Sequence, residues 1–484
     1  MRRPRLLALS AAAVGLLAFP LTAWAGHEND PRTKNLHPMG HIFEPKVLGG
    51  ATFDPVNQPE GDIHTDIAFS GKYAFQGNWD GFNIRDIRAP GNPKQVSRTF
   101  CDGNQGDIVV YDNVLVRSWN TPAGTPGAFG AGLTCDGQEV PEGFEGVHIF
   151  DISDLSDPEL VGSVALRCGS HTASAVPDPE NGRLIVYSSG SSVDCEGFDI
   201  IEIPLDDPGG AVHVGEVEEA EMMCHDIGVI QGDAMMAACA GHHGFQVWDI
   251  GGDAGGSFTA PVMIAMVDVN EVFGYEPDDP GFISIGHSAA FTWDGEVLMF
   301  GHEPGGGVAA RCQADAPDTD KSAMFFDTDT WEFLGMWTLP RPQGATENCS
   351  IHNGNIVPVR SGRYVLVIGN YQAGTWVVDF TDPSNPQTVA WSDPPPAPVP
   401  PESPFCCDVT GSWSTYWYNG FIYESNIGEG LNVFRLSGNT LAGSLRLPHL
   451  NPQTQEFTID SARPAAAPAK AKAAKAGKRG KRRR

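Results

Sequence analysis

Histidines recur along this sequence at nearly constant intervals. His171, His225, His287 and His352 are 54, 62 and 65 residues apart, and His64 stands in a similar context; each comes just before an alternating apolar segment. Neutral imidazole is a good ligand for zinc, copper, iron and nickel, and nitrogen ligands from separate segments need no local motif. If these segments repeat in space as they do in sequence, the five rings meet at one place and predict a metal site there.

Other polar residues are expected at the same place. His242, His243 and the pair His302-Glu303 follow the next apolar segments, and we count His242 and His302 among the candidate metal ligands. Carboxylates near the rings are expected to orient them by accepting their N–H groups: Asp66, Asp107, Asp226, Glu303 and Glu347. A second interpretation stays open, in which each recurring histidine caps a strand by bonding the backbone of the neighbouring repeat.

The segments that must position these histidines share one form. Phrases such as GVHIFDISDLSDPELVGSVAL (146–166) and GTWVVDFTDPSNPQTVAWS (374–392) are two alternating apolar strands joined by a turn of Asp, Pro, Gly or Asn. Another strand pair precedes each phrase. Seven repeats of four strands over residues 60–450 predict an all-β, seven-bladed β-propeller. A sandwich or a β-helix is the competing architecture, but two hairpins in each period favour blades.

Two of these phrases also carry a family resemblance. VHIFDISDLSDPELVGS and WVVDFTDPSNPQTVA resemble the repeats of LVIVD-repeat proteins, which are secreted or surface propellers of bacteria and archaea. The resemblance extends over roughly residues 60–450 and is most specific in the strand–Asp–turn–Pro–strand core. It implies a propeller fold and a location outside the cytoplasm, and it does not imply an activity.

The stretch MMCHDIGV (222–229) places Cys224, His225 and Asp226 side by side, as in a nucleophilic set. The even number of cysteines, 10, favours disulfides instead. In a blade, the start of the inner strand and the end of the second strand lie at the same rim, so cysteines there can meet. The bonds predicted within blades are Cys101–Cys135, Cys168–Cys195 and Cys224–Cys239. Cys312–Cys349 is expected to bridge neighbouring blades, and Cys406–Cys407 is the vicinal pair that remains.

Two alternatives to this disulfide pattern stay open. In the first, each bond is shifted to the next blade, as in Cys135–Cys168 and Cys195–Cys224. In the second, the vicinal pair Cys406-Cys407 is redox-active or binds metal.

The two ends of the chain differ from its body. Residues 1–25 combine three arginines, an apolar run and Ala23-Trp24-Ala25, which predicts a secretory signal peptide cut after Ala25. Residues 26–59 are expected to be an N-terminal extension, and residues 451–484 a disordered tail. Ten of the 31 basic residues lie within 463–484, whereas all 60 acidic residues lie between the signal peptide and that segment. So acidic a body repels nucleic acid.

These features predict a secreted or cell-surface module that binds a small molecule or a surface protein at a histidine-ringed channel mouth. The alternative is a copper- or zinc-dependent oxidoreductase or hydrolase that uses the same ring. The basic tail either contacts an anionic cell-wall polymer or is simply solvated. The sequence has no P-loop, G-x-S-x-G or H-E-x-x-H motif, and no later segment of transmembrane length.

Overall fold

The computed structural model describes residues 29–44, 63–126, 130–190, 195–217, 223–399, 401 and 405–459. The prediction of an all-β protein is confirmed: the only α-helix in these ranges is the short α1 (Val269–Phe273). No helix among these residues has the length and apolar character that crossing a bilayer requires. The expected signal peptide (1–25) and the basic segment 463–484 lie outside the described residues.

Antiparallel four-stranded units follow one another along the chain. The first strands of the units are β2 (His64–Ser70), β6 (Gln105–Tyr111), β12 (Thr172–Asp178), β16 (Ile227–Ile230), β20 (Gly286–Phe291), β24 (Asn353–Ile356) and β28 (Ser412–Tyr418). The second strands are β3 (Tyr73–Asn78), β7 (Val114–Trp119), β13 (Arg183–Ser189), β17 (Met236–Gly241), β21 (Val297–His302), β25 (Val365–Gly369) and β29 (Phe421–Asn426). The third strands are β4 (Gly81–Asp86), β10 (Gly146–Asp151), β14 (Phe198–Pro204), β18 (Gly244–Asp249), β22 (Ser322–Asp327), β26 (Thr375–Asp379) and β30 (Gly430–Leu436). The outer strands are β5 (Lys94–Phe100), β11 (Glu159–Ala165), β15 (Val212–Val217), β19 (Val262–Asp268), β23 (Phe333–Thr338) and β27 (Gln387–Ser392), and a small hairpin, β8 (Thr134–Cys135) and β9 (Gln138–Glu139), lies apart.

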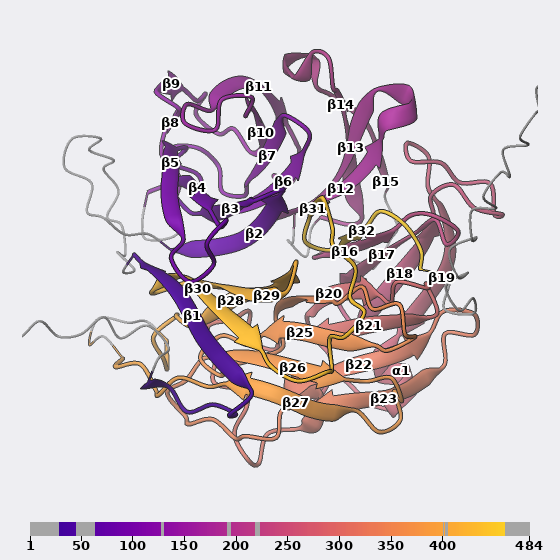
Figure 1. Ribbon diagram of the computed structural model, residues 1–484. Coiled ribbons are helices and arrows are strands. Elements are labelled where there is room, and N and C mark those ends of the chain that lie inside the picture. Colours follow the sequence, from indigo (N-terminus) through magenta and orange to yellow (C-terminus); the bar gives the residue numbers. More distant parts are fainter. Residues whose placement is uncertain are drawn as a thin grey trace, which may run out of the picture.

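The first strands form the inner wall of the molecule. Each contacts the first strand of the next unit, from β2 through β6, β12, β16, β20 and β24 to β28, which contacts β2 again (Figure 1). Neighbouring units pack apolar faces together; the rings of Phe82 and Phe150, from successive units, meet edge to face with centroids 5.0 Å apart. Radially arranged antiparallel sheets around a central channel make a β-propeller.

The N-terminal strand β1 (Leu36–Phe43) is the outer strand of the last unit. It pairs antiparallel with β30, with Leu36 opposite Leu436 and Phe43 opposite Gly430. The ring is thus closed by hydrogen bonds between a strand near the start of the chain and a strand near its end. Part of the N-terminal extension expected over 26–59 therefore belongs to the folded body.

The last described residues, 445–459, pass along the channel, and we call them the channel segment. Within it, β31 (His449–Leu450) pairs with the end of β2, and β32 (Thr454–Gln455) runs parallel to β16. The amide of Asn451 bonds both backbone groups of Val110 in β6, at 2.7 and 2.8 Å. Inner strands have no neighbouring strand on the channel side, so these contacts satisfy buried backbone groups. The folded body therefore runs past residue 450, where the sequence placed its end.

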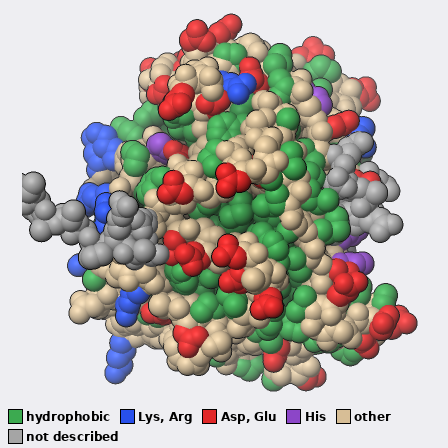
Figure 2. Space-filling model, turned by 90° about the vertical axis from the view of Figure 1, so that its right-hand side faces the viewer, with side chains coloured by type: hydrophobic (Ala, Val, Ile, Leu, Met, Phe, Trp, Pro, Cys, Tyr) green, Lys and Arg blue, Asp and Glu red, His purple; other side chains and the backbone are tan. Residues whose placement is uncertain are grey.

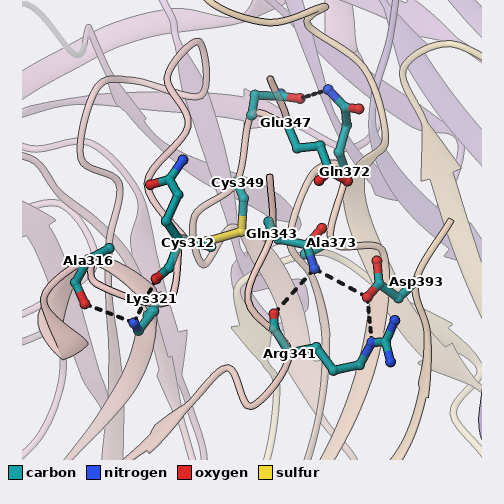
Figure 3. The surroundings of a disulfide bond; sticks show 12 residues. Cys312, Ala316, Lys321, Arg341, Gln343, Glu347, Cys349, Gln372, Ala373 and Asp393 are labelled. Atoms are coloured by element: carbon teal, nitrogen blue, oxygen red, sulfur yellow. Dashed lines mark hydrogen bonds and ion pairs between the residues drawn. A yellow bond between two sulfur atoms is a disulfide. The ribbon is translucent and has the colours of Figure 1, made fainter. Parts of the chain in front are cut away.

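Four of the predicted disulfides are confirmed: Cys101–Cys135, Cys168–Cys195, Cys224–Cys239 and Cys312–Cys349. The first three lie within one unit, and the fourth joins two successive units (Figure 3). The shifted connectivity is thereby excluded. The fifth bond is not formed: Sγ of Cys406 lies 2.9 Å from Sγ of Cys407 without a disulfide between them.

The outer surface is partly apolar and strongly acidic. On the side that carries β15 and β19, hydrophobic side chains and Asp or Glu side chains are intermixed, and Lys and Arg are sparse (Figure 2). The alternation of β19 exposes Val262, Ile264 and Met266.

Candidate functional site

Four of the predicted histidines lie side by side at the mouth of the channel. His171, His225 and His352 come just before β12, β16 and β24, and His287 is the second residue of β20. Successive ring centroids, in the order His171, His225, His287 and His352, are 4.5, 4.1 and 4.4 Å apart. Each of these histidines stands at the start of an inner strand. Because the inner strands are arranged around one channel, their starts bring the four imidazoles together.

These rings line a pocket of about 380 Å³. Its wall also includes Glu303 and Tyr371, which come from the units of His287 and His352, and Trp79 and Trp413, which come from two further units. The channel segment contacts the opposite ends of the inner strands, so the pocket and this segment occupy the two ends of the channel. A mostly apolar wall with a few converging polar groups is typical of a small-molecule site.

The tightest cluster in the pocket is His225, His287 and Glu303. One potential ligand atom from each lies within 4.8 Å of the others, and all three side chains are buried. In His225, Nδ1 lies 2.9 Å from Oδ1 of Asp226; in His287, Nδ1 lies 2.6 Å from Oγ of Ser288. Both rings thus use Nδ1 to bond the protein and keep Nε2 for a ligand. A bonded second nitrogen is the usual arrangement for a metal-binding imidazole.

His352 flanks this cluster in the same orientation. Its Nδ1 donates to the backbone carbonyl of Trp413, and its Nε2 lies 3.6 Å from Oε1 of Glu303. Nε2 of His287 lies 3.7 Å from the other carboxyl oxygen, Oε2. Glu303 therefore stands between two imidazole nitrogens that carry lone pairs.

Glu303 is positioned by its strand and by a tyrosine. It directly follows β21, and the hydroxyl of Tyr371 donates to its Oε1 at 2.5 Å. Burial raises the pKa of Glu303 to about 8, although the bond from Tyr371 acts in the opposite direction. The carboxyl group is therefore protonated at neutral pH in the metal-free protein.

Asp226 lies beneath the rings and behaves similarly. Burial raises its pKa to about 8, and Nε2 of Gln453 in the channel segment donates to its Oδ2 at 3.4 Å. The imidazoles shift the other way: burial lowers the pKa values of His225 and His352 to about 3 and that of His287 well below its usual range. The site thus combines neutral imidazoles with neutral carboxyl groups.

Three of the predicted ligands lie elsewhere. His64 is fully buried, with Nε2 3.5 Å from Oε2 of Glu44, and burial lowers its pKa to about 4. In His302, Nε2 accepts the backbone N–H of Ser284 and Nδ1 lies 3.3 Å from the carbonyl of Thr319, so neither nitrogen faces the pocket. The partly exposed His242 packs against His243, outside the pocket lining. The expected ring is therefore an arc of four.

Only two of the five carboxylates predicted to orient the histidines lie against them. Asp226 and Glu303 contact the histidines, as described. Asp66 accepts the Tyr416 hydroxyl at 3.0 Å and Asp107 accepts the backbone N–H of Ala173 at 2.8 Å, so both hold inner strands together. Glu347 lies in the surroundings of the Cys312–Cys349 disulfide (Figure 3). Its side chain accepts the backbone N–H of Gly344.

Tyr371 is the main residue that sequence reasoning missed. It stands two residues after β25, and Glu303 stands one residue after β21. Both therefore follow the second strand of a unit, and comparing these positions between repeats would have indicated it.

A second cluster with metal-like spacing is Cys101, Cys135 and His148. Its two sulfurs are joined in a disulfide, so they are not thiolate ligands.

Comparison with known proteins agrees with this architecture. The LVIVD repeat, a β-propeller repeat, matches residues 63–99 and 143–165. Two segments of the chain are thus similar to the LVIVD repeat. Among solved structures, the β-propeller domain of Cps50 (Swd1) from Myceliophteria thermophila is 11% identical, with a TM-score of 0.46, over 79% of this chain and 98% of that one. No curated protein matches the chain. None of these comparisons supports the enzymatic alternative.

The contact that fixes Glu303 can be tested at two neighbouring glycines, Gly306 and Gly307. A Cβ at Gly307 would lie 2.3 Å from Oη of Tyr371, whereas one at Gly306 would meet nothing within 4 Å; both residues have positive φ, +68° and +58°. Gly306→Ala should therefore cost about 1–2 kcal/mol through backbone strain alone. Gly307→Ala should cost roughly 1–3 kcal/mol more, because it also displaces Tyr371. Urea unfolding measures both, and equal losses would show that Tyr371 does not pack on this loop.

Proposed function

We propose that this protein is an extracytoplasmic, seven-bladed β-propeller that binds a transition metal, copper or zinc, at the channel mouth. The metal and the pocket above it then bind a small molecule or an exposed group of a surface protein. The observation that carries this proposal is the cluster of His225, His287 and Glu303, whose ligand atoms lie within 4.8 Å of one another. The repeat family is compatible with a binding role and names no ligand.

The chemistry of the cluster favours copper or zinc over a hard cation. Two imidazole nitrogens and one carboxylate oxygen form a mixed donor set that suits borderline metals. Calcium and magnesium prefer sites made entirely of oxygen. His352 is placed to be a fourth ligand or to bond a metal-bound group, since its Nε2 lies 3.6 Å from Glu303. Three protein ligands leave a position free for an incoming ligand.

The pocket supports a ligand beside the metal. About 380 Å³ is enough for a small molecule or one or two side chains. The aromatic rings of Trp413 and Tyr371, both within 5 Å of the His352 ring by centroid distance, provide flat apolar surface. The ligand expected here is therefore a small molecule or side chain with one metal-binding atom and an apolar body.

Metal binding can be assigned with single substitutions. Protein purified without a histidine tag should bind close to one copper or zinc ion per chain, measured by elemental analysis after dialysis. His287→Ala and Glu303→Gln should lower the affinity by about 10- to 100-fold or more, because each removes a proposed ligand. His242→Ala is the matched control, since this ring lies outside the pocket. Undiminished loading of both site variants would contradict the proposal.

The raised pKa of Glu303 gives the binding an unusual pH dependence. The imidazoles, with pKa values of about 3 for His225 and His352, are already neutral, so protons do not compete with metal for their nitrogens. Glu303, with a pKa of about 8, must lose its proton to bind metal. Affinity should therefore rise by at least about tenfold per pH unit up to roughly pH 8 and then level off.

Competition with a chelator between about pH 5 and pH 9 measures this slope. In Glu303→Gln the slope should fall by about one log unit per pH unit, because the contribution of Asp226 to the slope is the same in both proteins. A profile that levels off near pH 6.5, the usual pKa of histidine, would contradict a site with neutral imidazoles.

The location outside the cytoplasm rests on the signal-like residues 1–25 and on four disulfides, which persist in oxidising compartments. The chain exported by its host should begin at Gly26, as N-terminal sequencing would show. An uncleaved N-terminus would contradict the signal peptide.

Deleting residues 463–484 should shift the protein from the cell wall to the medium, because this segment supplies ten positive charges. Unchanged association with the cell wall would contradict the role of residues 463–484.

A further inference from the structure

Two adjacent cysteines, Cys406 and Cys407, lie against Val308, which lines the pocket. Sγ of Cys406 lies 2.9 Å from Sγ of Cys407, yet no disulfide joins them. Cys406 is exposed, whereas Cys407 is fully buried. Both sulfurs approach one backbone atom, the carbonyl oxygen of Val308, at 3.9 and 3.2 Å. Thiol S–H groups are weak donors, so the pair holds this carbonyl from one side.

Val308 ends a loop that begins at the proposed metal ligand Glu303. We call residues 304–308 the glycine loop, because it contains Gly305, Gly306 and Gly307, with φ values of +84°, +58° and +68°. Gly306, Gly307 and Val308 line the pocket. Three consecutive glycines in this region adopt other conformations at little steric cost, so the loop depends on its contacts for its shape.

Few side-chain contacts hold the glycine loop. The amide of Asn348 donates to the carbonyl of Gly307 at 2.9 Å, and the two thiols hold the next carbonyl. A disulfide sulfur carries no proton. Oxidation of the pair would therefore remove the S–H donor of Cys407, the nearer sulfur, from the carbonyl of Val308 and leave Asn348 in place.

We propose that Cys406 and Cys407 are a redox-active pair that closes to a vicinal disulfide and so releases the glycine loop at the mouth of the pocket. The oxidant is a small disulfide such as oxidised glutathione, or a protein disulfide of the extracytoplasmic space. The proposal goes beyond metal binding and does not depend on it.

The chemistry of this step follows from the unequal exposure of the two sulfurs. The exposed Cys406 thiolate attacks one sulfur of the oxidant, forms a mixed disulfide and expels one thiolate. The sulfur of Cys407, after losing its proton, attacks Sγ of Cys406 and expels the second thiolate. The protein loses two electrons and two protons, and the oxidant is reduced to two thiols.

The buried position of Cys407 influences both the equilibrium and the rate. Burial raises the pKa of Cys407 to about 12. A thiol of high pKa gains little from ionisation in the reduced state and is a poor leaving group from a disulfide. Once formed, the bond should therefore be reduced slowly, as suits a protein that works in an oxidising compartment.

The full chain tests this directly in two redox states. The native protein is treated with dithiothreitol or with oxidised glutathione, denatured with an alkylating agent present, and mapped by mass spectrometry. The peptide with Cys406 and Cys407 should carry two alkyl groups after reduction and neither alkyl nor glutathione groups after oxidation. Amide hydrogen exchange in residues 305–310 should be about two- to tenfold faster in the oxidised protein, because hydrogen bonds to Val308 are lost.

Two substitutions at the buried cysteine separate oxidation from loss of packing. Cys407→Ser keeps a donor for Val308 but cannot form the bond, so exchange in the loop should stay slow under both treatments. Cys407→Ala loses the donor, so exchange should be fast under both. A glutathione adduct that persists on Cys406, or identical loop exchange in the two states of the unsubstituted protein, would overturn the proposal. Both readouts remain available whether or not metal binds.

Discussion

Burial of polar side chains at the channel mouth determines the charge of every group at the site. The inner strands bring imidazoles and carboxyl groups from several units into one enclosed space, and burial is the largest cause of each pKa shift there. A buried charge without a partner is costly, and the described residues that line the pocket include no lysine or arginine. The imidazoles therefore stay unprotonated and the carboxyl groups keep their protons. A bound cation reverses this balance, because it binds neutral nitrogen and stabilises the carboxylate.

The fold holds these groups in place by joining the two ends of the described chain to its middle. Strand β1 completes the last unit through β30, and the channel segment bonds inner strands from β2 to β20. Both connections consist of hydrogen bonds, so closure depends on register rather than on a covalent link. Disulfides add local constraints within units, and Cys312–Cys349 adds one between units. A ligand site made of residues from four units requires such closure, because a shift of one unit would separate the rings.

The sequence predicted the features that repeat from unit to unit. It failed for contacts made by segments that have no repeat pattern. The spacing of His171, His225, His287 and His352 placed four rings together, since each repeats one position of a unit. His64 holds that position too, but Glu44, from a segment with no repeat pattern, lies against it. The sequence assigned β1 to the extension and residues 451–459 of the channel segment to the tail, because their polar residues give little amphipathic signal. Asn451 shows why: its contribution is an amide pair with a backbone, which no periodicity reveals.

The channel segment has a second consequence, which concerns the site itself. Its residue Gln453 donates to Asp226, and Asp226 in turn lies against Nδ1 of His225. A residue from one end of the channel thus helps to fix the ring orientation at the other. If metal binds Nε2 of His225, the partial positive charge that develops at Nδ1 favours ionisation of Asp226, and the amide of Gln453 stabilises the resulting carboxylate. On the proposed metal site, Asp226 would thereby couple the packing of the channel to the metal affinity of its mouth, which would account for a carboxyl group in so buried a position.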